Sequence, residues 1–387
     1  MKLEPRHLSL VASSRSKLVL CLALASIGCG GRSNLTPADN VSGASSSGGG
    51  GPGSGGGGSG AGGSGGSAMA SIAQVSAKWG HVCAINATGH LSCWGNYISG
   101  AVGIDETVSF AKAPLPVDPM HTYRKVSAGV GTTCAIRTDG TLWCWGHNQG
   151  GPLATGDRTP SPTPVAIGAE HDWEDVTIGS GMACGLRAGG QLYCWGSPDY
   201  GATSNEPLGP EVLKEPTLIE GTWTALGSHF YETLAVRDDG SLWFTANNGV
   251  FLPVETFNGH AKSVSVGPIY ALVVDTNGAL FRLNSTVDQQ VTQTPVAPGV
   301  VFAGALASAY AHCAISADHR MYCGDDYSSD QKPFAPLGDG YTDWATVGVG
   351  AAFGCGSRQD GSIWCWGKLQ NYAGADIDYG PTPTQVD

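Results

Sequence analysis

Thr133 to Gly146 read TCAIRTDGTLWCWG, a stretch in which two cysteines lie ten positions apart on either side of a Thr-Asp-Gly turn. Asp-Gly between two β-prone arms is a strong signal for a β-hairpin. Six further segments share the pattern: VCAINATGHLSCWG from Val82, ACGLRAGGQLYCWG from Ala183, TLAVRDDGSLWFTA from Thr233, ALVVDTNGALFRLN from Ala271, HCAISADHRMYCGD from His312 and GCGSRQDGSIWCWG from Gly354. The chain therefore contains seven copies of one hairpin.

The copies follow one another at regular intervals. Their first cysteine positions are 83, 134, 184, 234, 272, 313 and 355, so neighbouring copies are separated by 38 to 51 residues. A short apolar strand is predicted before each hairpin, as in KVSAG (125–129), and a proline-marked strand after it, as in APLPV (113–117). Four strands in 40–50 residues is the size of one blade of a β-propeller.

The longer pattern V-S-A-G-x-x-x-x-C-A-I-R-T-D-G-T-L-W-C-W-G resembles the regulator-of-chromosome-condensation repeat, and the resemblance covers residues 69–387. It implies an all-β fold, a seven-bladed β-propeller of four-stranded blades. The copies that begin near Leu234 and Leu272 depart from the pattern, and His319 stands where the turn glycine is expected. The resemblance also implies that His81, His229 and His312, which recur around the hairpin starts, are structural residues held by backbone groups.

The cysteines are present in pairs or not at all. Two copies lack both, with Leu234 and Phe244 in one and Leu272 and Arg282 in the other. Opposed positions of a hairpin have Cα atoms about 4.5 Å apart when they are not hydrogen-bonded, near the lower end of disulfide geometry. A zinc site would need clustered Cys-x-x-Cys spacing. We predict five disulfides, each within one hairpin: Cys83–Cys93, Cys134–Cys144, Cys184–Cys194, Cys313–Cys323 and Cys355–Cys365.

Residues 1–28 are predicted to be a signal peptide, since basic residues precede the apolar run LVLCLALASIG (18–28), which is short for a membrane span. Ser26-Ile27-Gly28-Cys29 resembles a bacterial lipobox, although the family pattern prefers Leu where Ser26 stands. We predict lipid modification of Cys29, with ordinary cleavage after Ala25 as the alternative. The expected location is the cell envelope, as an outer-membrane or cell-surface lipoprotein, or else secretion.

Residues 29–68 are predicted to be a flexible tether, because the Gly/Ser tract at 42–67 has no apolar side chains to bury. The body that follows holds 15 basic and 30 acidic residues, a net charge of -15. Non-specific nucleic-acid binding needs a basic surface, so no nucleic-acid partner is expected. Contact with a membrane is expected only through the lipid, and the protein is expected to be a monomer.

No motif of an enzyme family is present, so we predict that the protein is not an enzyme and needs no metal or cofactor. Trp94, Trp145, Trp195 and Trp366 recur once per repeat, which favours packing between blades over ligand stacking or light sensing. The light-sensing members of the family carry a Gly-Trp-Arg-His-Thr motif, which this chain lacks.

The first three repeats are longer than the others, and their surplus falls in the connections at 96–112, 147–162 and 197–215. Loops on a rigid scaffold are where recognition is usually built. We predict a binding module for a protein or glycan at the cell surface, with inhibition of an extracytoplasmic enzyme as one alternative and a propeller lyase or hydrolase as another. The candidate binding residues are Tyr97, Phe110, Arg158, Asp199 and Tyr200.

Overall fold

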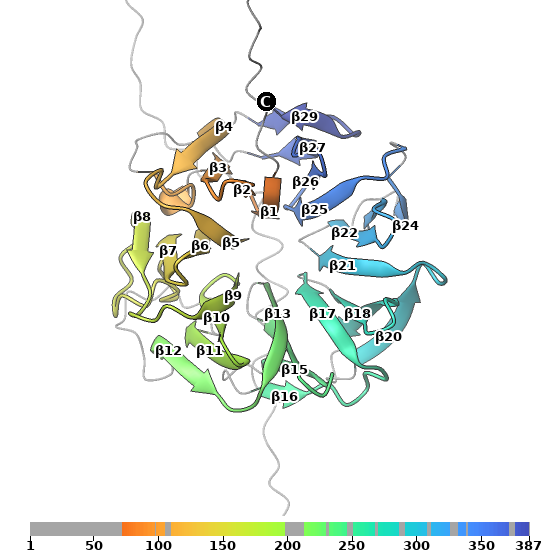
Figure 1. The fold of residues 1–387 in the computed structure, drawn as a ribbon, viewed down its shortest axis with the longest axis horizontal. Coiled ribbons are helices and arrows are strands. Elements are labelled where there is room, and N and C mark those ends of the chain that lie inside the picture. The colour runs from red at the N-terminus through yellow and green to blue at the C-terminus, as the bar shows by residue number, and fades with distance from the viewer. Residues whose placement is uncertain are drawn as a thin grey trace, which may run out of the picture. The chain divides into compact units, whose positions relative to one another are not determined.

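Seven antiparallel sheets are arranged around a common centre, as Figure 1 shows, and each sheet is one blade. This computed structural model describes residues 72–96, 98–104, 110–197, 213–229, 232–245, 251–267, 270–285, 291–307, 311–325, 332–337, 340–370 and 376–386. The predicted all-β seven-bladed propeller is confirmed. The predicted signal peptide, the tether and Cys29 lie outside the described residues.

Each blade uses one continuous segment of chain, and its strands follow in order from the centre outward. Blades 1 to 3 consist of β1 (Ile72–Lys78), β2 (His81–Asn86), β3 (Leu91–Asn96) and β4 (Phe110–Val117); β5 (Tyr123–Ala128), β6 (Thr132–Arg137), β7 (Leu142–Gly146) and β8 (Ser161–Ala166); and β9 (Trp173–Ile178), β10 (Met182–Arg187), β11 (Gln191–Gly196) and β12 (Leu213–Ile219). A 3₁₀ turn, η1 (Ile98–Gly100), follows β3.

Blades 4 to 7 repeat this plan. They consist of β13 (Trp223–His229), β14 (Glu232–Arg237), β15 (Leu242–Thr245) and β16 (Phe251–Pro253); β17 (Ala261–Val266), β18 (Tyr270–Asp275), β19 (Leu280–Ser285) and β20 (Val291–Val296); β21 (Phe302–Ala307), β22 (Ala311–Ser316), β23 (Met321–Asp325) and β24 (Lys332–Pro336); and β25 (Trp344–Val349), β26 (Phe353–Arg358), β27 (Ile363–Leu369), β28 (Ile377–Asp378) and β29 (Thr384–Val386). In blade 7 both β28 and β29 pair with β27.

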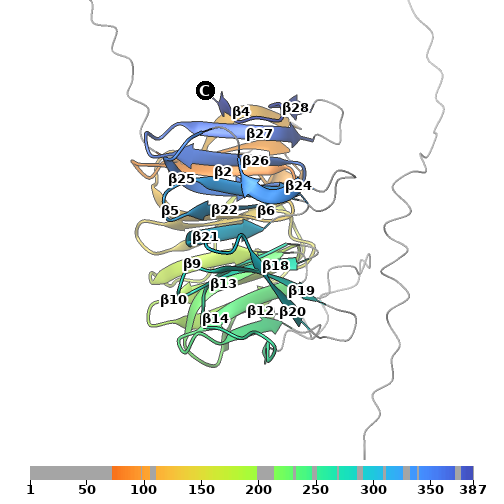
Figure 2. The ribbon, with the colours of Figure 1, turned by 90° about the vertical axis from the view of Figure 1, so that its right-hand side faces the viewer.

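Antiparallel order gives the propeller two distinct faces, which lie at the two sides of the edge-on view in Figure 2. We call one the connection face. It carries the turns between the first and second strands of each blade and the connections between the third and fourth strands. The other, the hairpin face, carries the turns of the repeated hairpins and the links from blade to blade.

The repeated Asp-Gly-Thr-Leu-Trp sequence is explained by hydrogen bonds within the turn. In blade 2, Asp139 Oδ1 accepts from the Thr141 backbone N–H (3.0 Å) and hydroxyl (2.7 Å), and the Thr141 hydroxyl accepts from Trp143 Nε1 (2.9 Å). Gly140 has φ +84°, and a Cβ there would lie 1.9 Å from the carbonyl oxygen of His171 in the next link. A side chain is therefore excluded, and the turn can dock against the neighbouring blade.

The five predicted disulfides are confirmed as pairs at bonding distance. In each hairpin the two cysteines are direct cross-strand partners, with Cα atoms 4.1–4.2 Å apart. The first cysteine of every pair is buried. Such pairs persist in oxidising compartments and fit an extracellular environment.

The core lies largely between neighbouring blades. Large aromatic residues begin the innermost strands of several blades and are at most 2% exposed: Tyr123, Trp173, Trp223, Phe302 and Trp344. The tryptophans of the repeated Cys-Trp-Gly sequence are also buried, with Trp94, Trp145 and Trp195 at 0% and Trp366 at 8% exposed. Packing between blades, as predicted for these tryptophans, is confirmed. In the part of the chain that the structure describes, no helix is long and apolar enough to cross a membrane.

The ring closes between blade 7 and blade 1 without exchange of a strand. β1 packs beside β25, and each blade keeps all of its own strands. Two hydrogen bonds cross this junction: Ala351 N–H donates to the Trp79 carbonyl (3.0 Å), and Trp94 Nε1 donates to the Tyr379 hydroxyl (3.3 Å). Side-by-side packing and these bonds therefore close the ring.

Candidate recognition face

The long connections of blades 1 to 3 follow the third strand of each blade, so they begin on the connection face. Of the predicted binding residues, Tyr97, Asp199 and Tyr200 lie outside the described residues, and Arg158 is half-buried. Phe110 is 8% exposed and packs in the same core cluster as Trp94. This burial argues against Phe110 as a contact residue, because it begins β4 and its side chain packs in the core.

The base of each described long connection is fastened by a tryptophan of the next blade. Trp145 of blade 2 donates its indole N–H to the Ala101 carbonyl in the first connection (3.0 Å). Trp195 of blade 3 donates to the Pro152 carbonyl in the second (2.8 Å). These indoles are fully buried, so the bonds are shielded from water. The repeated tryptophan thus joins adjacent blades and holds the preceding connection in place.

The second connection is also organised from within by the buried Asn148. Its amide nitrogen lies within 3.1 Å of three oxygens: the Thr155 hydroxyl and the carbonyls of Asp157 and Thr159. Its Oδ1 accepts from the Leu153 backbone N–H (3.0 Å). One side chain therefore satisfies several backbone groups of this connection. The loop is thus held in one conformation before a partner binds.

Lys78 lies at the end of β1 and spans the centre of the ring on the connection face. Its amine donates to the Ile178 carbonyl of blade 3 (3.3 Å) and to the Ser228 carbonyl of blade 4. Burial lowers the pKa of Lys78 to about 7. The equivalent position is glycine in blades 2, 3, 5 and 7, at residues 129, 179, 267 and 350. Lysine at this place therefore ties one blade to two others.

The three histidines near the hairpin starts are buried, and two of them lie at hydrogen-bond distance from a side chain of a neighbouring blade. His81 Nε2 lies 2.9 Å from the Thr133 hydroxyl of blade 2, and burial lowers the pKa of His81 to about 4. The Tyr270 hydroxyl bonds His312 Nδ1. Burial, followed by the charge of Lys78, lowers the pKa of His229. The expected structural role fits these contacts, although side chains rather than backbone groups hold His81 and His312.

An arginine stacked on aromatic rings recurs near the hairpin face, a feature that was not predicted from the sequence. The guanidinium carbon lies 3.7 Å from a ring centroid in blade 2 (Arg137 on Trp143), 3.9 Å in blade 4 (Arg237 on Trp243) and 3.9 Å in blade 7 (Arg358 on Tyr341). In blade 3 the nearest ring, that of Tyr193, is 5.2 Å from Arg187. The stack is therefore open in blade 3. The signal was present in the Arg-x-x-Gly-x-Leu-Trp spacing of the repeats.

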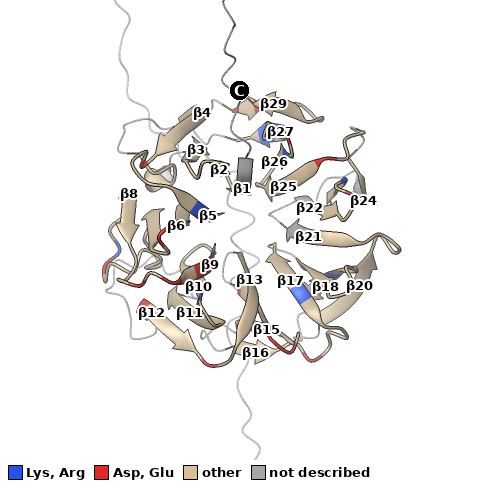
Figure 3. Ribbon diagram, in the orientation of Figure 1, with Lys and Arg blue, Asp and Glu red and all other residues tan. Residues whose placement is uncertain are grey.

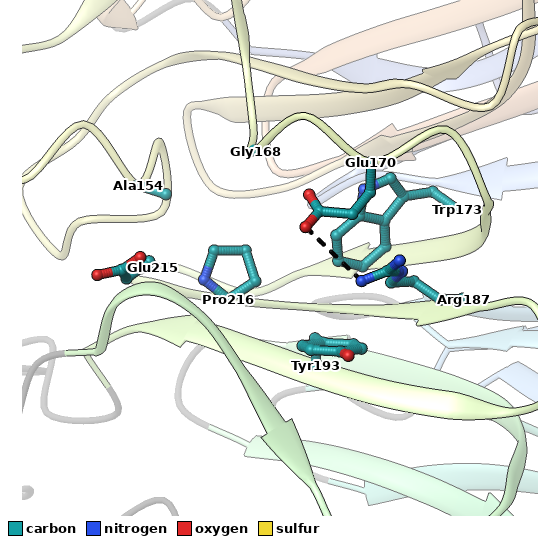
Figure 4. Close-up of a pocket in the computed structure, with 8 residues that line it drawn as sticks. All are labelled: Ala154, Gly168, Glu170, Trp173, Arg187, Tyr193, Glu215 and Pro216. Carbon is teal, nitrogen blue, oxygen red and sulfur yellow. Dashed lines mark ion pairs between the residues drawn. The ribbon is translucent and has the colours of Figure 1, made fainter.

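A cavity of about 280 Å³ lies beside this open stack, between the outer parts of blades 2 and 3 (Figure 4). Trp173, Arg187 and Tyr193 form one end, and an ion pair of 3.7 Å joins Arg187 to Glu170. The remaining lining residues are Ala154 of the second long connection, Gly168 of the link between the blades, and Glu215 and Pro216 of β12. The cavity thus adjoins the second long connection and the strand that follows the third.

The described basic residues are spread over several blades, while acidic residues mark many of the links and turns (Figure 3). Among the described residues, no group of three or more His, Cys, Asp or Glu side chains is placed to hold a metal ion.

The sequence pattern of the Regulator of chromosome condensation (RCC1) repeat matches residues 72–96, 123–151 and 173–202, in blades 1 to 3. The ultraviolet-B receptor UVR8 of Arabidopsis thaliana is 30% identical over 98 residues, which are 25% of this chain and 22% of the receptor. The chain thus matches about a fifth of that receptor's length.

Among solved structures, human WBSCR16 is similar with a TM-score of 0.50 and 14% identity, covering 82% of each chain. Yeast RCC1 (Prp20), solved with Kap60 bound, gives a TM-score of 0.47 and 15% identity, covering 81% of this chain and 74% of that one. At such identities the likeness to human WBSCR16 concerns the fold alone.

Proposed function

Because the chain is an RCC1-like repeat propeller, we propose that it is an exported interaction module that binds a macromolecular partner through the connection face of blades 1 to 3. The observation that carries this proposal is the fastening of the connections by Trp145 and Trp195. A partner then meets loops that are already ordered, and less conformational entropy is lost on binding.

Export is supported by the five cysteine pairs at disulfide distance, which fit an oxidising environment. We propose that the mature chain begins at lipid-modified Cys29 and that residues 30–68 tether the propeller to the membrane. A Cys29→Ser protein should then be released from membranes and processed differently. Normal processing and membrane retention of that variant would contradict lipidation.

The proposed binding surface comprises Tyr97, Arg158, Asp199 and Tyr200, with Phe110 left out because it is buried. The exported protein should capture a partner from envelope or medium proteins. Joint replacement of Tyr97, Arg158 and Tyr200 by Ala should weaken that binding at least about tenfold, since a few aromatic and arginine residues usually dominate an interface.

Met120 provides a matched control. Its side chain is 87% exposed, and it lies in the link between blades 1 and 2, on the hairpin face. Met120→Ala should leave partner binding unchanged. Equal binding by the triple variant and the parent, or a loss in Met120→Ala alone, would move the site to the hairpin face. A captured hydrolase that loses activity in the complex would identify the module as an enzyme inhibitor.

A further inference from the structure

We propose, building on the proposed function, that the cavity beside Tyr193 receives an aromatic side chain of the protein partner, flanked there by a positive charge. The cavity lies toward the hairpin face, since Gly168 and Glu170 belong to a link between blades, and it meets the proposed binding surface at Ala154 of the second long connection (Figure 4). Because the seven blades are copies of one repeat, the residues of this cavity can be compared with those at the same positions in the other blades.

The third strand of blade 3 carries a tyrosine where blades 2, 4 and 7 carry a tryptophan. Tyr193 pairs with Gly185, and the equivalent pairs are Trp143 with Ala135, Trp243 with Ala235 and Trp364 with Gly356. All three indoles donate to a hydroxyl two residues earlier, at 2.7–2.9 Å. Those of blades 2 and 4 lie against the arginine, while in blade 7 the ring of Tyr341 takes that place. In blade 3 that earlier residue is Gln191 and no indole occupies the place. The cavity therefore lies where blades 2, 4 and 7 carry an indole ring.

The outer strand does not refill the space. In blade 6, which also has a tyrosine on its third strand, Phe334 of β24 stacks on Tyr322 with ring centroids 6.0 Å apart. Phe334 precedes the residue paired with the second cysteine. By the same register the blade 3 residue is Pro216, whose ring lines the cavity. Blade 3 thus has neither the indole of blades 2, 4 and 7 nor the outer phenylalanine of blade 6.

The back wall offers an unused hydrogen-bond donor. Trp173 is fully buried, and its Nε1–H has no hydrogen-bond partner among the described residues. A buried donor without an acceptor costs free energy. A peptide segment that inserts a ring into the cavity brings carbonyl groups that can accept this hydrogen.

The charges around the cavity favour a cation. Arg187 is already held by Asp172, with Nε to Oδ1 at 2.6 Å and Nη2 to Oδ2 at 3.2 Å. Glu170 pairs with the same arginine only at 3.7 Å, and Glu215 is exposed on the rim. Among the lining residues, one cation therefore stands beside two carboxylates, and that cation is already held by Asp172. A positive group beside the bound ring would balance these carboxylates and gain from the ring of Tyr193.

Tryptamine, an indole with an attached ammonium group, is the probe that tests this site without the partner. It should bind the exported protein with a Kd of about 1 mM, the range expected for a fragment of its size. Ligand-observed NMR gives the affinity, and the side-chain N–H signal of Trp173 should shift. Indole-3-propionate, which carries a negative charge, should bind at least about tenfold more weakly.

Tyr193→Trp restores the indole of blades 2, 4 and 7 and should weaken tryptamine binding at least about tenfold. Pro216→Phe, which copies the outer strand of blade 6, provides a second way to fill the cavity. Glu170→Gln with Glu215→Gln should weaken tryptamine about fivefold and leave neutral indole unchanged. Glu255→Gln, an exposed residue in the link between blades 4 and 5, is the matched control and should change neither.

The site proposal is overturned if tryptamine fails to bind at about 10 mM, or binds equally well to folded Tyr193→Trp and Pro216→Phe proteins. These results are independent of partner capture. If the partner binds but tryptamine does not, the cavity site is wrong and the proposed interaction module still stands. If tryptamine binds but no partner is captured, the cavity is a ligand site and the proposed interaction module is contradicted. If the Tyr193→Trp protein also loses partner binding, the cavity is part of the partner-binding surface.

Discussion

Blades 2 and 5 share one strand plan but are locked by different cross-strand contacts. In blade 2, Cys134 and Cys144 face each other with Cα atoms 4.1 Å apart. In blade 5 the same register pairs Leu272 with Arg282. The leucine is fully buried, while the guanidinium carbon of the arginine lies 4.3 Å from the Tyr270 ring centroid and its Nε donates to Asn284 Oδ1 (3.0 Å).

In blade 4 the same cross-strand position is occupied by a third kind of pair, Leu234 opposite Phe244. A disulfide, an apolar pair and a leucine–arginine pair thus occupy one structural position. The backbone register is therefore set by the turn and by packing between blades, and the disulfide adds stability to a geometry that forms without it. Blades 4 and 5 also lie together in the ring, so the cross-linked part of the propeller is one continuous arc of five blades.

Removal of one cross-link should have the largest effect on stability. The double change Cys134→Ala and Cys144→Ala opens a loop of about 11 residues, and the chain-entropy relation gives a loss of about 2.8 kcal/mol. Chemical denaturation monitored by circular dichroism measures it. A loss below about 0.5 kcal/mol would mean that blade 2 is held as blade 5 is, by packing alone.

Adding a cross-link to blade 4 should have a smaller effect. Leu234→Cys with Phe244→Cys should form a sixth disulfide, because the two residues are direct partners in the register. The net gain should be about 1 kcal/mol or less, since the entropic gain is offset by the loss of a buried leucine and a packed phenylalanine. Thiol titration tests bond formation and denaturation tests stability. Free thiols in the folded variant would show that blade 4 differs in register.

Lys78, which joins blade 1 to blades 3 and 4, should titrate near neutral pH. The pKa of Lys78 is lowered by burial to about 7, so between that pH and its ordinary pKa the unfolded chain holds a proton that the folded chain lacks. The contribution of Lys78 to stability should therefore rise by about 1 kcal/mol from pH 7 to pH 8 and stay flat below about pH 6, where the buried histidines titrate instead. The comparison is with Lys78→Met, measured by denaturation at each pH. If the Lys78→Met protein shows the same pH dependence of stability, Lys78 is not the group that titrates.

The substitute contact of blade 5 should be the weakest of the set. Arg282→Ala removes a part-exposed cation from the ring of Tyr270 and should cost about 0.5–1 kcal/mol. Arg282→Lys keeps the charge and should lose less. Equal losses in the two variants would point to the planar stack and the bond to Asn284, rather than to the charge.

The sequence predicted the blades and the cysteine pairing because both depend on local repetition. A turn such as Asp139-Gly140 and two cysteines ten positions apart define the register of a hairpin without reference to distant residues. The candidate site was harder. Phe110 was a candidate because it lies in the long connection at 96–112, yet the register of β3 and β4 places it in the core.

The cavity beside Tyr193 could not be predicted from one repeat. It depends on Tyr193, which replaces the tryptophan of blades 2, 4 and 7, and on the way that blade 2 packs against blade 3. Lys78 was equally hidden, since its two acceptors are 100 and 150 positions away in the chain. Contacts between blades carry this information, and no local pattern encodes them.

The closure of the ring without strand exchange has a consequence for how such a chain can be rearranged. Every blade is a self-contained segment, and the links between successive blades contain only three to seven residues between strand ends. A gene permuted to start at β5, with a linker of similar length between Val386 and Ile72, should therefore encode the same seven sheets. The order in which the blades are translated is then free to change, and with it the end of the chain that could be attached to a membrane.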